Sequence, residues 1–100
     1  MSNALTEMNR QLEEIKLPVS NDARLELRQL LSDKIAAWLE RSPEHLFTVF
    51  YQLDLGEEQV SDIFKKKMGK ELSDGLADMV INRQIQRLET YQNYIKEKEL

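Results

Sequence analysis

The sequence predicts one all-α domain: a compact bundle of about five helices, with a long C-terminal helix and an N-terminal helix docked as an arm. Apolar residues recur at helical spacing along the chain, and no stretch alternates apolar and polar residues as a half-buried strand does. The chain has only 3 glycines and 2 prolines, and they fall where helices should start or stop. Three features thus favour an all-helical fold.

The length and composition fit a single domain. The 100 residues are 41% hydrophobic and 32% charged, which is the balance of a soluble globular protein. We divide the domain 1–100 into an arm helix with its loop at 1–19 and core helices at 20–100.

The arm helix is expected at about residues 4–16 and ends before Pro18. Its apolar residues form a narrow heptad seam: Leu5, Met8, Leu12 and Ile15. Two heptads are too few for a free-standing coiled coil. The arm should therefore dock, either on its own domain or on a second copy.

The second helix should begin at about residues 20–22, where Ser20, Asn21 and Asp22 offer capping oxygens, and end near Arg41. Its apolar face consists of Leu27, Leu30, Leu31, Ile35, Trp38 and Leu39. A third helix at about 43–54 starts with a proline in its first position, which is typical of helix starts. Its apolar residues are Leu46, Phe47, Val49, Phe50, Tyr51 and Leu53. Because they cover more than half of the circumference, we expect this helix at the centre of the core.

The fourth helix, at about 57–68, begins with acids and ends with lysines, an order that favours the helix dipole. Its expected buried stripe is Val60, Ile63, Phe64 and Met68. Gly69 should then adopt a left-handed cap, and Ser73 or Asp74 should cap a fifth helix that runs to Lys96 or beyond.

The fifth helix has an unusually wide apolar arc when it is drawn at about 100° per residue. It could simply pack against several short helices, or one flank could meet a second protomer. The candidate interface residues are Gln84, Arg87, Leu88, Tyr91, Tyr94 and Ile95. Gln84 lies within the arc, where its amide either bonds to nearby backbone or water, or fixes the register of a helix–helix interface.

No motif for catalysis or for a cofactor is visible. The chain has no cysteine and only one histidine, so a thiolate or multi-histidine metal site cannot form. His45 falls on the polar side of the third helix, where a solvent-exposed role is expected. We therefore expect no enzyme activity, no cofactor and no metal.

The residues best support a role as a small protein–protein interaction module. This module would self-associate as a homodimer through the long C-terminal helix. The alternative is a weak nucleic-acid-associated protein. Its candidate anion or nucleic-acid contacts are Lys65, Lys66, Lys67, Lys70 and Arg83. The net charge of −4 makes nucleic acid the less favoured partner, and Asp74 and Asp78 would repel phosphates. Arg83 and Arg87 border the apolar arc, and ion pairing with acids of the second or third helix is their expected role.

The expected location is the cytoplasm. No stretch has the roughly 20 apolar residues that span a bilayer, the first residues show no signal-peptide pattern, and the lack of cysteine fits a reducing compartment. We expect no membrane partner.

Four segments carry a family resemblance: 38–39 (WL), 44–47 (EHLF), 51–55 (YQLDL) and 81–87 (INRQIQR). In them the chain resembles a group of small, uncharacterised, all-helical bacterial proteins of unknown function, over roughly residues 35–90. The resemblance implies a bacterial cytoplasmic protein, and it implies no functional residue.

Overall fold

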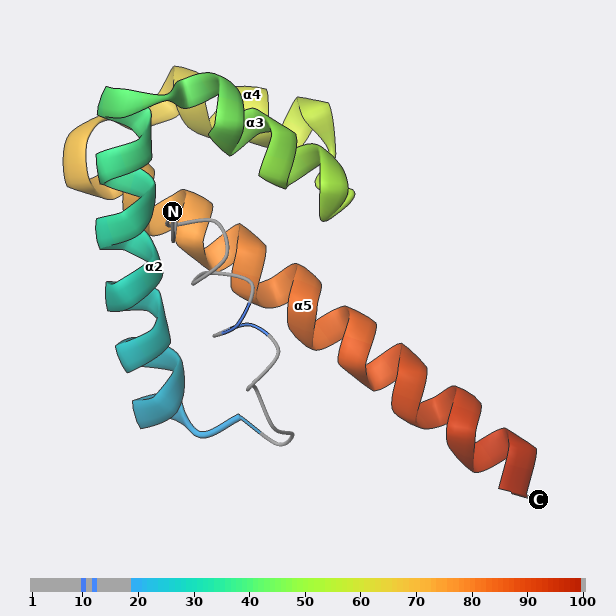
Figure 1. Ribbon diagram of the computed structural model, residues 1–100. Helices are drawn as coiled ribbons and strands as arrows, with labels where there is room; N and C mark the ends of the chain where they lie inside the picture. Colours follow the sequence, from blue (N-terminus) through green and yellow to red (C-terminus); the bar gives the residue numbers. More distant parts are fainter. Residues whose placement is uncertain (1–9, 11, 13–18, 100) are drawn as a thin grey trace.

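The computed structural model describes residues 10, 12 and 19–99, and it places four helices there (Figure 1). They are α2 (Asn21–Arg41), α3 (Pro43–Gln52), α4 (Glu57–Lys66) and α5 (Gly69–Glu99). This part of the chain contains no strand, so the all-α class with a long C-terminal helix is confirmed. The described helices number one fewer than the expected five. The arm helix at 4–16 lies outside the described residues, apart from Arg10 and Leu12.

The bounds of α2 follow from local capping, and Ser20 is the one of the three candidate residues that caps its start. The hydroxyl of Ser20 accepts a hydrogen bond of 3.1 Å from the backbone N–H of Ala23. At the other end, the N–H of Ser42 donates to the carbonyl of Trp38 at 2.8 Å, and α3 starts at the next residue. The prediction that Leu30 belongs to the apolar face of α2 is wrong, because its side chain is 47% exposed.

The core is centred on α2 and α5, which form the most extensive helix pair in the described structure. The two helices run antiparallel, since Ser32 lies opposite Asp74 while Arg24 lies opposite Asn82. Their fully buried apolar residues are Leu31, Ile35, Leu76, Ala77, Val80 and Ile81. This pair, rather than α3, therefore holds the centre of the core.

The prediction of a central α3 is wrong because its neighbours cover only one of its faces. Leu46, Val49 and Phe50 are buried on that face. On the other side Phe47 is 47% exposed and Tyr51 is 83% exposed. The wide apolar arc of α3 thus reaches the molecular surface.

The end of α3 is a Schellman motif built on Asp54. The N–H of Asp54 donates to the carbonyl of Tyr51, and the N–H of Leu55 donates to that of Phe50, both at 3.0 Å. Asp54 has a φ of +58°, the left-handed conformation that aspartate tolerates better than most residues. The helix consequently ends at Gln52, two residues earlier than expected.

The turn between α4 and α5 confirms one expectation and corrects two others. Gly69 has the predicted left-handed backbone, with a φ of +62°. However, α5 already begins at Gly69, earlier than expected. The side chains of Ser73 and Asp74 lie within the helix, where they bond to Ser32 on α2 and do not cap a helix start. Met68 follows the last residue of α4 and is 82% exposed, so it is not part of the buried stripe.

The length of α5 sets the shape of the molecule. Its 31 residues span about 46 Å at about 1.5 Å per residue, close to the longest extent of 48 Å. The radius of gyration is 14.3 Å, above the roughly 13 Å of a compact domain of this size. Figure 1 shows the C-terminal half of α5 extending beyond the other helices.

We predict that Leu31→Ala lowers the free energy of unfolding by about 2–5 kcal/mol, because it opens a cavity between α2 and α5. The control is Leu25→Ala on the same helix, where the leucine is 59% exposed, and its expected loss is below about 1 kcal/mol. Urea unfolding followed by circular dichroism measures both. Equal losses for the two variants would contradict the observed packing of α2.

Candidate functional site

The predicted interface residues on α5 divide into a part-buried group and an exposed group. Gln84 and Leu88 are part-buried, and Arg87 is exposed beside them. Tyr91 is 61% exposed, and Tyr94 is 54% exposed. Ile95 completes the exposed group at 37%. We call residues 88–98 the α5 tail.

Residues 89–98 of the α5 tail are exposed because α2 does not reach them, whereas Leu88 at its start is part-buried. The antiparallel register places Arg24, near the first residue of α2, opposite Asn82. Residues of α5 beyond about 86 therefore have no residue of α2 opposite them. The apolar stripe of α5 nonetheless continues from Val80 through Leu88 to Ile95 on one face. The apolar stripe of α5 therefore continues beyond the part of the helix that α2 covers.

Gln84 lies where this stripe leaves the core, and its amide is satisfied by backbone. Its Nε2 donates a hydrogen bond of 3.3 Å to the carbonyl of Leu12. Leu12 itself is 2% exposed and belongs to the core. The geometry therefore matches the backbone-bonded alternative for Gln84, with Leu12 as the partner.

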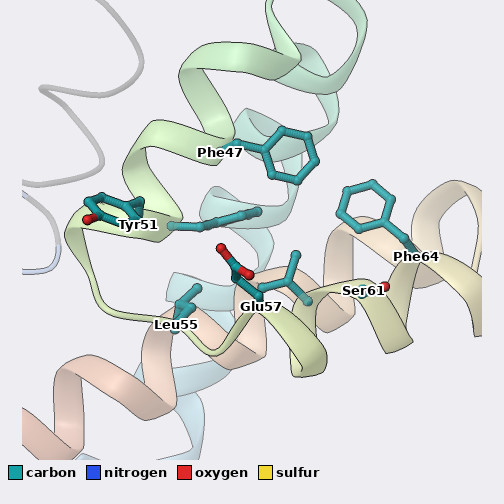
Figure 2. A pocket seen from close by; sticks show the side chains of 8 residues that line it. Phe47, Tyr51, Leu55, Glu57, Ser61 and Phe64 are labelled. Carbon is teal, nitrogen blue, oxygen red and sulfur yellow. The ribbon is translucent and has the colours of Figure 1, made fainter.

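A second surface lies between α3 and α4, and sequence reasoning missed it. It is an apolar groove of about 530 Å³. We call it the α3–α4 groove, and its lining residues are Phe47, Phe50, Tyr51, Leu55, Glu57, Val60, Ser61 and Phe64. Figure 2 shows Phe47 of α3 facing Phe64 of α4, with Tyr51 at the opposite end of the groove.

The aromatic rings give the groove its walls. Phe47 contacts Phe50 edge to face, with ring centroids 6.2 Å apart. Across the groove, Phe47 and Phe64 have centroids 5.6 Å apart. Glu57, in the first turn of α4, is the single charged residue among the lining residues. The groove is therefore an aromatic surface with one negative charge.

The end of α3 positions this groove. The left-handed Asp54 turns the chain at the end of α3. The N–H of Leu55 then bonds to the carbonyl of Phe50, and α4 begins at Glu57. Arg83 of α5 holds this turn in place, since its Nε donates to the carbonyl of Leu53 at 3.1 Å. The same guanidinium pairs with the carboxylate of Asp54 at 3.4 Å. The surplus of aromatic residues on α3 was the available signal for the groove.

The predicted anion-binding residues are not all brought together. Lys65, Lys66, Lys67 and Lys70 are all exposed around the α4–α5 turn. The stem of Lys67 lies over Gly75, and Lys70 pairs with Asp74 at 3.4 Å. Arg83 is about 20 Å further along α5 and is occupied at the end of α3. The lysines form one cluster, and Arg83 belongs to a different part of the structure.

Asp74 and Asp78, expected to repel phosphates, take part in the contact between α2 and α5. Asp78 pairs with Arg28 at 3.0 Å and with Arg24 at 3.8 Å. Asp74 accepts a hydrogen bond of 2.5 Å from Ser32. The Ser32 hydroxyl lowers the pKa of Asp74 below its ordinary value, and the charges of Lys70 and Arg28 act in the same direction.

The described residues show no arrangement typical of a catalytic or metal centre. His45 is exposed and packs against Trp38, with ring centroids 5.6 Å apart. Within 10, 12 and 19–99, no group of three acidic or histidine side chains could hold a metal ion. None of the described helices combines the length and the apolar character needed to cross a bilayer. The expectations of no enzyme activity and no cofactor stay predictions.

Comparisons with protein families, with curated proteins and with solved structures give no match to this chain. The resemblance to small bacterial proteins therefore stays a prediction. Any functional conclusion has to come from the two exposed surfaces themselves.

We predict that Asp74→Asn lowers stability at neutral pH and that this difference from wild type becomes smaller in acid. A lowered pKa means that ionised Asp74 stabilises the fold above its ordinary pKa of 3.8, and that this contribution is lost as the pH falls through the lower folded value. Urea unfolding at pH 7 and near pH 3 measures the effect. Asp62→Asn, at an exposed position on α4, controls for the loss of one charge. A difference of equal size at both pH values would count against the Ser32–Asp74 bond.

Proposed function

We propose that the chain is a small protein–protein interaction module that self-associates through the α5 tail. The observation that carries this proposal is the apolar stripe of α5, which passes from the core onto an exposed, projecting helix end. Val80 is fully buried, whereas Tyr91 on the same face is 61% exposed. A face with core-like residues and no intramolecular cover in the described structure is typical of an interface.

The energetics of a projecting helix support the proposal. The α5 tail has about 11 residues, and isolated helices of that length are marginal in water because packing supplies most helical stability. Burial against another protein would stabilise the tail. Its exposed side chains suit such burial, since tyrosine is enriched at protein interfaces.

The proposal predicts that Tyr91→Glu with Ile95→Glu converts a self-associating protein into a folded monomer. Both side chains are exposed in one copy, so charges there should block association without opening the core. Light scattering on a sizing column gives the mass at micromolar concentration. Circular dichroism checks that the fold is retained.

The matched control is Thr90→Glu with Asn93→Glu, which adds the same charge on the other side of the tail. It should associate like wild type. Monomeric wild-type protein at these concentrations, or equal loss of association in both double variants, would overturn the role of the tail face.

Weak nucleic-acid binding is a second candidate function, and one observation favours it. The four lysines at the α4–α5 turn are exposed, while Asp78 is paired with arginines of α2. The negative charge of Asp78, which would repel phosphates, is therefore partly neutralised. This proposal uses the lysine cluster without Arg83.

If this second candidate is right, the protein is retained on heparin at low salt, and Lys65→Glu with Lys66→Glu abolishes retention. The control is Lys96→Glu with Lys98→Glu, which changes the net charge equally at the far end of α5. Absence of wild-type retention at low salt would remove nucleic acid from consideration.

A further inference from the structure

The two exposed apolar surfaces of this chain are complementary to one another. We propose that the α5 tail of one copy docks in the α3–α4 groove of a second copy. This inference rests on the proposed self-association and deepens it, because it names the surface that the tail meets.

The groove has the features of a site that receives a helix. Its walls are aromatic, its volume of about 530 Å³ is within the range of pockets that hold sizeable ligands, and it lies open at the surface between two short helices. Tyr51 at its rim is 83% exposed, and Phe47 is 47% exposed. These rings form an apolar surface that a protein normally covers when it binds a partner.

The tail offers the matching pattern. Leu88, Tyr91 and Ile95 have the i, i+3 and i+7 spacing by which an amphipathic helix inserts into a groove. The same face carries positive charge, because the ammonium of Lys98 lies 5.2 Å from the ring centroid of Tyr94. The docking face of the tail is thus apolar with one lysine, while Glu89, Lys96 and Glu97 fall on its other side and leave the tail with no net charge.

The docking face of the tail and the groove each carry one charge, Lys98 and Glu57, and these two charges are opposite in sign. Glu57 is the one charged residue that lines the groove, and Glu58 follows it on the exposed start of α4. Lys98 on the tail can approach these carboxylates while its neighbours contact the aromatic walls. Complementary charges of this kind select and orient a partner more than they add affinity.

The contact has to join two molecules. The helix α5 is continuous from Gly69 to Glu99, and Figure 1 shows its C-terminal half directed away from α3 and α4. The tail of one copy cannot reach its own groove without breaking the helix. If two copies exchange tails reciprocally, the contact closes as a symmetric dimer; without reciprocity it continues as a chain.

The test uses a groove variant with an intact tail. Tyr51→Lys with Glu57→Lys places positive charge where Lys98 of the tail would dock, and both residues are exposed in one copy. We expect the dissociation constant for self-association to rise at least about tenfold, as on loss of an interface anchor. Glu44→Lys with Thr48→Lys makes the same charge change on the polar side of α3, outside the groove lining, and should have little effect.

Mixing variants separates this proposal from simple tail-to-tail association. The groove variant and the tail variant (Tyr91→Glu with Ile95→Glu) should each be monomeric, and their mixture should form a heterodimer through one intact groove and one intact tail. Wild-type association of the groove variant, or no heterodimer in the mixture, would overturn the groove as the docking surface. If the groove variant associates like wild type, the proposed self-association through the tail would still stand.

The absence of cysteine allows a direct check of the contact. Ser61→Cys in the groove and Ile95→Cys in the tail, mixed and oxidised, should form mainly the disulfide-linked heterodimer. Asn93→Cys, on the other side of the tail, should replace Ile95→Cys poorly. Predominant linkage between two Ile95→Cys copies would indicate tail-to-tail packing and contradict the proposal.

Discussion

The structure depends above all on the antiparallel packing of α2 against α5. Leu31 and Ile35 of α2 meet the fully buried residues of α5, and no other pair of described helices is as extensive. Polar contacts along the edge set the register, since Ser32 bonds to Asp74 and Arg28 pairs with Asp78. Hydrogen-bonded and charged groups fit opposite one another in a single register only, whereas apolar contacts tolerate sliding. The pair therefore fixes how far α5 extends beyond α2.

The same constraint leaves two apolar surfaces open. The helix α2 has 21 residues and α5 has 31, so the stripe of α5 runs past its cover. At the other side of the molecule, α3 packs one face on α2 and presents the other with α4 as an aromatic groove. Arg83 links the two regions, because it lies on α5 and holds the turn at Asp54 that shapes the groove. In our proposal, both surfaces are halves of one intermolecular contact.

Sequence reasoning predicted several features that depend on residues close to one another in the chain. The proline start of α3 and the left-handed Gly69 were predicted, and Ser20 was one of three candidate caps for α2. The start of α5 and the end of α3 were both placed too late in the chain. Sequence reasoning failed where tertiary partners decide, because periodicity shows that a face is apolar but not which element covers it. The aromatic face of α3 was read as core for that reason, and the left-handed Asp54 gave no recognised signal. The wide apolar arc of α5 left two alternatives open in the sequence, packing against several short helices or contact with a second copy, and the second of these stays a prediction.

Hydrogen exchange along α5, measured at low and at high protein concentration, tests the central claim most directly. In dilute protein, the amides of residues 76–85 should exchange slowly because α2 covers them, and those of residues 89–98 should exchange quickly because that half of the helix lacks packing. At high concentration, the amides of residues 89–98 should become protected as the tail is covered by a second copy. Equal protection of both halves in dilute protein, unchanged at high concentration, would contradict the claim that α5 continues beyond the core to meet a partner.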